Sequence, residues 1–450
     1  MESKPVTLIV SDLHMGDGNP GDDFVDDQHQ FAKFINKQAA TPEGQAGRIE
    51  LIINGDFLEF VQVYPQAYQL GSFDYWCSEN ESLLKLGAIL NGHVDVFEEI
   101  KKFQQPGNRV TLFAGNHDVD LYWGAVQERI RDKAGDVNFE MGDVWYQRYG
   151  RRLRISHGHL FESIDPANKF NHWRDPRLGQ PNSLVQRLEM CPGTLFVVRF
   201  VNFLEDKYPF ADNLHPEMAL ANVLWREDRW GLKTIAWVLA RFAGRFPKAF
   251  LAIDEKADIG RQLLDSISVD PLFRETLARI YRDVLRVADM TPDRVRIGLD
   301  SEEAVAQFVE QLLQTSSHWD EWLDALDLAE PGISSTSKHG RGTLAIQAAS
   351  KIDSRAACTE VAKSQWRDGA QVVVLGHTHL PQTIAEDTHR YYNPGSWTRY
   401  IDAADIESLT LEELQRETQF PFQLNCVRVE DKGTEILTSD LREIDARRAG

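Results

Sequence analysis

Five short runs of apolar and β-branched residues, each followed at once by a polar motif, constrain the fold of this chain more than any other feature. They are VTLIV at 6–10, LIIN at 51–54, VTLFA at 110–114, LRIS at 153–156 and VVVL at 372–375. Their hydrophobicity is continuous rather than alternating, which indicates strands covered on both faces. Helical segments separate several of the runs; in one of them, 83–103, apolar residues recur at three- and four-residue intervals. The pattern predicts an α/β core.

The chain between these runs is not uniform. From 161 to 370 the pattern becomes mainly helical, with cap signals such as Asp270 before Pro271. Strand-like character returns at 371–375, around RYYNPGSW and in LNCVRVE at 424–430. We therefore expect a first part of the core at 1–160, a helical insertion or cap at 161–370, and a C-terminal part of the core at 371–450.

Cysteine usage and hydropathy bear on the compartment. The four cysteines, Cys77, Cys191, Cys358 and Cys426, are far apart and form no CxxC pair, so neither a disulfide framework nor a thiolate zinc site is indicated. No apolar stretch is long enough to span a bilayer, and the N-terminus lacks the pattern of an export signal. We expect a cytoplasmic protein.

The charge of the chain bears on its partners. The formal net charge of −20 repels polyanions at long range and makes nucleic acid a less favoured partner. Bound divalent cations or a local basic groove would overcome that sign, because screening limits the reach of distant charges.

The polar motifs carry the chemistry. SDLH, NGDFLE, GNHD, SHGH and GHTH each stand at the carboxyl end of an expected strand, where ligands gather in α/β sheets. Strand ends from distant parts of the chain would thus bring together carboxylate, amide and imidazole groups, a mixture that suits two divalent metals. The candidate ligands are Asp12, His14, Asp56, Asn116, His157, His377 and His379.

This set of motifs, in this order, resembles the calcineurin-like metallophosphoesterases, whose pattern is D-x-H, G-D-x-x-D, G-N-H-D/E, H and G-H-x-H. The resemblance implies a metallophosphoesterase-type αββα sandwich and a centre of two divalent ions, with manganese the first choice and iron or zinc next. It also implies the ligands of each ion. Asp12, His14 and His379 would hold the first ion, Asn116, His157 and His377 the second, and Asp56 would bridge them.

The resemblance extends to residues that act on the substrate. His117 resembles the family histidine that contacts phosphate and protonates the leaving oxygen, and Asp118 beside it would orient the imidazole. Glu59 stands where the family pattern has aspartate and is left out of the ligand set. His159, in a stretch similar to one found in bacterial members, is a candidate for the pocket wall.

The expected reaction is hydrolysis of a phosphoester or phosphoanhydride bond by water activated at two metal ions. Small phosphodiesters or nucleotides, lipid-linked pyrophosphates such as UDP-diacylglucosamine, and nucleic acid are the competing substrates. A basic amphipathic segment at 230–246 modestly favours a lipid-linked substrate or peripheral membrane contact, although a cap helix packed on its neighbours with a solvated basic face is the better explanation of the pattern. The alternative of another class is a non-catalytic scaffold, against which the complete ligand set argues. We expect the insertion to determine substrate choice rather than the chemical step, because every candidate ligand lies outside it.

Overall fold

A computed structural model describes two long parts of the chain and scattered positions between them. The first part is 6–161, apart from 20, 25–28, 64–76, 143 and 149–150, and the second is 354–440, apart from 400, 403–408, 417–419, 421–423 and 431–435. Between 187 and 300 only scattered residues are described. Most of the expected insertion therefore lies outside the described residues, and its helical character stays a prediction.

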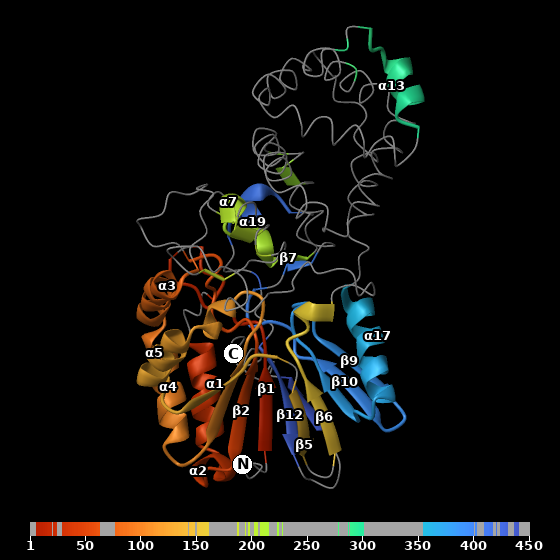
Figure 1. The fold of residues 1–450 in the computed structure, drawn as a ribbon. Coiled ribbons are helices and arrows are strands. Elements are labelled where there is room, and N and C mark those ends of the chain that lie inside the picture. The colour runs from red at the N-terminus through yellow and green to blue at the C-terminus, as the bar shows by residue number, and fades with distance from the viewer. Residues whose placement is uncertain are drawn as a thin grey trace.

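The described residues form a mixed α/β fold with two main sheets (Figure 1). The first sheet has the order β13-β12-β1-β2-β3-β4 and the second β5-β6-β8-β10-β9. The strands of the first sheet are β1 Val6–Val10, β2 Ile49–Asn54, β3 Arg109–Phe113, β4 Val137–Glu140, β12 Asn425–Glu430 and β13 Ile436–Asp440. Those of the second are β5 Val144–Arg148, β6 Arg151–Ile155, β8 Val372–Val374, β9 Gln382–Glu386 and β10 His389–Asn393. The five predicted strands are confirmed as β1, β2, β3, β6 and β8.

Both sheets combine parallel and antiparallel pairs. β1 to β4 run parallel, whereas β12 is antiparallel to β1 and β13 to β12. In the second sheet β6, β8 and β10 run parallel, and β5 and β9 are antiparallel additions at its two edges. The carboxyl ends of β1, β2 and β3 therefore lie side by side, as do those of β6 and β8.

Three hydrophobic clusters show how the layers pack. Ile9, Ile52 and Phe113 of the first sheet pack with Leu153 and Val374 of the second, so the sheets meet face to face. The other face of the first sheet is covered by α1 Gln30–Ala39, α3 Glu79–Gly92, α4 Val94–Gln104 and α5 Gly124–Ala134. α17 Ser354–Arg367 covers the outer face of the second sheet. This helix, from the end of the insertion range, is thus part of the core layers.

The helix expected at 83–103 is two helices, α3 and α4. Ser78 and Glu81 form a capping box that begins α3. His93 breaks the run with φ −129° and ψ 43°, outside the helical region. Its imidazole Nε2 lies 2.7 Å from Asp22 Oδ2, a contact that ties the break to the loop after β1. Apolar periodicity continues through His93, and for that reason the sequence did not reveal the break.

The remaining described elements are short. They are α2 Pro42–Gln45, η1 Val119–Tyr122, η2 His159–Phe161, α7 Asn202–Glu205, η5 Ala211–Asn213, β7 Leu214–His215, α13 Pro292–Gly298, β11 Ile401–Asp402 and α19 Leu411–Leu414. β7 pairs in parallel with β11, which joins the insertion to the chain that follows GHTH. No helix in the part of the chain that the structure describes is long and apolar enough to cross a bilayer.

Candidate metal centre

The candidate ligands meet at the carboxyl ends of the strands of both sheets, the upper edge in Figure 1. Backbone hydrogen bonds continue past the strand ends and join the loops that follow them. The amides of Leu13 and His14 donate to the carbonyl of Asp56 at 2.8 and 2.9 Å, and the amide of Gly376 donates to the carbonyl of His157 at 2.6 Å. Motifs from distant parts of the sequence are therefore neighbours in the structure.

The backbone at these loops adopts a conformation that residues other than glycine rarely take. Positive φ angles are found at Asp12 (55°), His14 (48°), Asp56 (49°), His377 (69°) and His379 (55°). Such left-handed residues cost free energy and persist only where the surroundings enforce them, and they cluster at functional sites. Five of the eight described non-glycine residues with positive φ are thus candidate ligands.

The ligand atoms form two groups that could each hold a metal ion. Asp12, His14 and His379 make the first, with His14 Nε2 at 3.0 Å from His379 Nε2 and His379 Nε2 at 3.6 Å from Asp12 Oδ1. Asp56, His157 and His377 make the second, and His157 Nε2 lies 2.9 Å from Asp56 Oδ2. That last pair is at ion-pair distance without the angular geometry of a hydrogen bond.

Asp56 lies between the two groups. Its Oδ2 atom is also 3.8 Å from His14 Nε2 in the first group, and its Oδ1 accepts a 2.9 Å hydrogen bond from the amide of His117. Burial favours the neutral acid, but the imidazoles of His157 and His117 hold the pKa of Asp56 well below its usual value. Asp56 is therefore an ionised carboxylate placed to contact cations on both sides.

The donor set fits divalent metals. Buried imidazoles and ionised carboxylates are the ligands that manganese, iron and zinc accept. Asn116 adds an amide: its Oδ1 is buried and has no hydrogen-bond partner among the residues that the structure describes. A buried polar atom without a partner is costly, and a cation would satisfy it. The residues present therefore fit a metal ion on the Asn116 side of the site.

Glycines let the loops approach this closely. A Cβ atom on Gly115 would stand 2.0 Å from Asp56 Oδ1, and one on Gly376 would stand 1.9 Å from Ser11 Oγ. Both distances are far below van der Waals contact, so any side chain here would push the ligand loops apart. The glycine beside Asn116 and the glycine before His377 are requirements of the packing.

Glu59, which the sequence left outside the ligand set, contacts one ligand histidine of the first group, His14, and also His117. Its Oε2 lies 2.7 Å from His14 Nδ1 and 2.6 Å from His117 Nδ1, and these three residues form a third group with metal-ligating atoms. Burial favours the neutral acid, but the charge of His117 and hydrogen bonds from His117 and His14 lower the pKa of Glu59 to about 2. An ionised Glu59 only accepts, so both Nδ1 atoms donate to it.

The carboxylate of Asp118 binds backbone amides of two ligand loops, and its expected role in orienting His117 stays a prediction. Its Oδ2 accepts from the amide of Phe57 at 2.9 Å and its Oδ1 from the amide of Gly115 at 2.5 Å. The side chain is fully buried. Burial, followed by the charge of Asp56, raises the pKa of Asp118 to about 7. The His117 imidazole contacts Glu59, and Asp118 joins two ligand loops through their backbone amides.

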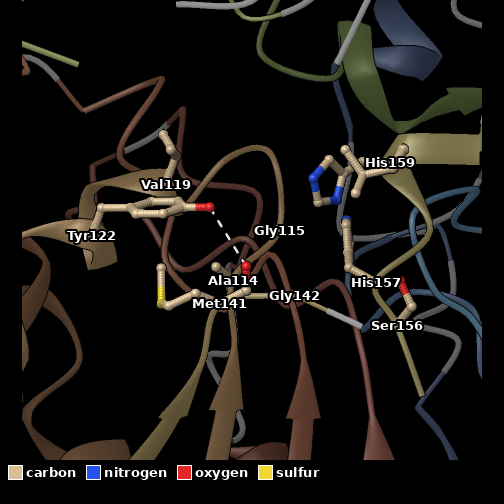
Figure 2. A pocket seen from close by; sticks show the side chains of 10 residues that line it. Ala114, Gly115, Val119, Tyr122, Met141, Gly142, Ser156, His157 and His159 are labelled. Atoms are coloured by element: carbon tan, nitrogen blue, oxygen red, sulfur yellow. Dashed lines mark hydrogen bonds between the residues drawn. The ribbon is translucent and has the colours of Figure 1, made fainter. Parts of the chain in front are cut away.

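A cavity of about 80 Å3 opens beside the second group. Figure 2 shows His157 and His159 on one side of it and Tyr122 with Met141 on the other. The Tyr122 hydroxyl donates a long hydrogen bond of 3.5 Å to the carbonyl of Met141. His159 thus lines a cavity next to the candidate centre, where the sequence had placed a pocket residue.

The turn after β10 supports the GHTH loop. Asn393 Nδ2 donates to the carbonyl of Gly376 at 2.8 Å and to Thr378 Oγ1 at 3.0 Å. The amide of Trp397 donates to the carbonyl of Asp12 at 2.9 Å. Trp397 itself is buried against Phe31 and Phe34.

Comparison with known proteins adds no assignment, because no protein-family model and no curated protein sequence matches the chain.

Proposed function

We propose that this chain is a metal-dependent phosphoesterase of the calcineurin-like type, with two divalent ions held by Asp12, His14 and His379 on one side and by Asn116, His157 and His377 on the other. Asp56 is the bridge. One observation carries the proposal: an ionised, fully buried Asp56 stands between two groups of ligating side chains at one edge of the sheets. The helix–sheet–sheet–helix layering supports the same family.

Two divalent cations would polarise a phosphoryl oxygen and lower the pKa of a water molecule, which favours hydrolysis near neutral pH. The chain's own residues have complementary tasks. Glu59 accepts from Nδ1 of His117 and so directs Nε2, on the opposite side of the ring, away from itself. His117 is the residue placed to contact the phosphate and to protonate the leaving oxygen, because its imidazole reaches the surface with 16% of its side chain exposed.

The ligands for the first ion include His14, whose ring is oriented by the same carboxylate oxygen. Glu59 therefore couples a metal ligand to the proton donor. Manganese is the first choice of metal and iron or zinc the next, since mixed nitrogen and oxygen ligands suit all three.

The substrate is a phosphoester or phosphoanhydride whose class the site itself leaves open. The amphipathic segment at 230–246 lies outside the described residues, so the lipid-linked pyrophosphate and the membrane contact rest on the sequence alone. The same holds for a nuclease activity and for a scaffold without catalysis.

A substrate panel tests the proposal. The purified chain is stripped with a chelator, reloaded with Mn²⁺, and assayed on bis(p-nitrophenyl) phosphate, p-nitrophenyl phosphate, a UDP-sugar lipid and single-stranded DNA. We expect hydrolysis of at least one substrate that requires the metal and that falls strongly in His117→Asn. Full activity in protein shown by elemental analysis to contain no metal would contradict the proposal, as would no activity on any substrate with Mn²⁺, Fe²⁺ or Zn²⁺.

A further inference from the structure

Helix α7 of the insertion contacts the turn that follows β2. Asn202 Nδ2 donates to the carbonyl of Val61 at 2.9 Å, and Gln62 Nε2 donates to Glu205 Oε1 at 2.7 Å. Both α7 side chains are buried. We call these two hydrogen bonds the α7 contact. In Figure 1, α7 lies above the carboxyl ends of the strands of the first sheet, on the side of the candidate centre.

The turn held by the α7 contact is the one that holds Glu59. The amides of Val61 and Gln62 donate to Glu59 Oε1 at 3.0 and 3.2 Å. Its other oxygen, Oε2, meets His14 Nδ1 and His117 Nδ1. Each oxygen of this carboxylate therefore has two partners, and one pair of partners belongs to the turn that α7 touches.

From this sequence of contacts we infer that Asn202 and Glu205 are positioning residues for the candidate centre, acting through the 61–62 turn and Glu59 on His14 and His117. The inference rests on the proposed function for its catalytic consequence. The backbone of Glu59 has its own support, a 2.9 Å hydrogen bond from its amide to the carbonyl of Met15. Loss of the α7 contact thus leaves the strand end in place and releases the carboxylate's Oε1 side. The insertion then supports the chemical step as well as substrate choice.

Another contact between the same insertion and the core supplies a matched control. Arg187 Nη2 donates to Glu81 Oε1 at 2.7 Å and its Nε to Oε2 at 3.1 Å, on the first turn of α3. The two hydrogen bonds of this pair join the insertion to α3, away from the hydrogen bonds that hold the Glu59 carboxylate. Arg187→Gln therefore weakens docking of the insertion in general, whereas the α7 variants disturb Glu59 in particular.

The experiment compares Asn202→Ala/Glu205→Ala with Arg187→Gln on bis(p-nitrophenyl) phosphate in Mn²⁺. In the double variant we expect kcat to fall about 3- to 10-fold, no more than in Glu59→Gln, while KM stays within about twofold and metal content at saturating Mn²⁺ is unchanged, because a displaced catalytic group slows turnover more than binding. Arg187→Gln should keep its kcat within about twofold. Glu205→Gln preserves an oxygen that accepts from Gln62 and should recover most of the loss caused by Glu205→Ala.

A double-mutant cycle with Glu59→Gln tests whether Asn202 and Glu205 act through Glu59. Residues that act through one group are not additive, so the α7 variants should lower kcat little further in the Glu59→Gln background. A loss of the same size in both backgrounds would overturn the assignment to Glu59. A double variant with the kcat of Arg187→Gln would overturn it as well.

Hydrogen exchange separates this inference from the proposed function. In the metal-free chain the amides of Val61 and Gln62 should exchange faster in the double variant than in Arg187→Gln, measured by mass spectrometry on peptides that cover the turn. Equal exchange in the two variants contradicts the inference whatever the activity. If the unaltered chain hydrolyses no phosphoester while exchange at the turn rises in the double variant as expected, the positioning role of the α7 contact is supported and the proposed function is contradicted.

Discussion

The two halves of the candidate centre are held in place by different kinds of contact. In the half with Asn116, the His157 ring is fixed by the sheet itself: Nδ1 donates to the backbone carbonyl of Asn54 at 2.8 Å, at the end of β2. In the other half, the His14 ring is fixed by a side chain, Glu59, whose own position depends on a turn touched by the insertion.

This difference separates a rigid half from an adjustable one. A backbone carbonyl within a buried strand has little freedom, whereas a carboxylate keeps its rotamer only as long as its partners stay in place. His117, the proposed proton donor, belongs to the adjustable half because it shares Glu59 with His14. Through the 61–62 turn and Glu59, the insertion is therefore connected to the proposed proton donor, whereas His157 is held by the carbonyl of Asn54.

The largest effect is expected from Asp56→Asn, which removes the charge that both halves share. Ionised Asp56 contacts His157 at 2.9 Å and His14 at 3.8 Å. Metal content and turnover should fall together, turnover on the order of 1000-fold or more, since several kcal/mol of metal-derived stabilisation are lost. Elemental analysis and kcat on the same preparation measure both. Full metal content in this variant would contradict the bridging role.

His117→Asn should lower turnover without lowering metal content, unlike Asp56→Asn, which should lower both. Its imidazole is proposed to transfer a proton without holding a metal, so turnover should fall about 100-fold or more at unchanged metal content. His29→Asn is the matched control, because His29 pairs with Asp95 at the surface, with 64% of its side chain exposed. Metal loss equal to that of Asp56→Asn would refute the division of roles.

Glu59→Gln should act on one half only. The glutamine side chain keeps the size of glutamate, but its neutral amide oxygen is a weaker acceptor for the two imidazoles than the charged carboxylate. We therefore expect about a 10-fold loss of turnover and weaker binding of one of the two Mn²⁺ ions. Titration calorimetry resolves the two binding steps. Glu50→Gln removes an equally buried carboxylate at the other end of β2 and should leave both steps unchanged. Equal weakening of the two ions by Glu59→Gln would remove the distinction between the halves.

Sequence reasoning found the strands and brought the candidate ligands to one edge because both follow from local patterns: buried β-branched runs and polar residues directly after them. It expected Asp118 to orient its neighbour His117, whereas the contacts of Asp118 that the structure describes are with the amides of Phe57 and Gly115, partners that no local pattern indicates. It passed over Glu59 because spacing does not show which partners a carboxylate reaches. The contacts of Asn202 and Glu205 with the 61–62 turn connect residues more than 140 apart, which no local pattern encodes.

The smallest effect concerns the rigid half in metal-free protein and takes the form of a pH dependence. Burial favours neutral His157, but Asp56 and Asp12 raise its pKa from 6.5 to about 9. A histidine whose pKa is raised on folding stabilises the fold fully below pH 6.5, and that contribution is lost as the pH rises through about 9. The free energy of unfolding of the chelated chain, measured by denaturant titration, should therefore fall between pH 6.5 and 9. Mn²⁺ should reverse the trend, because metal binding requires neutral imidazole and strengthens as protons leave. A stability of the chelated chain that stays constant or rises across this window would show that His157 is not charged beside Asp56, and the rigid half would then lack the ion pair that this comparison assigns to it.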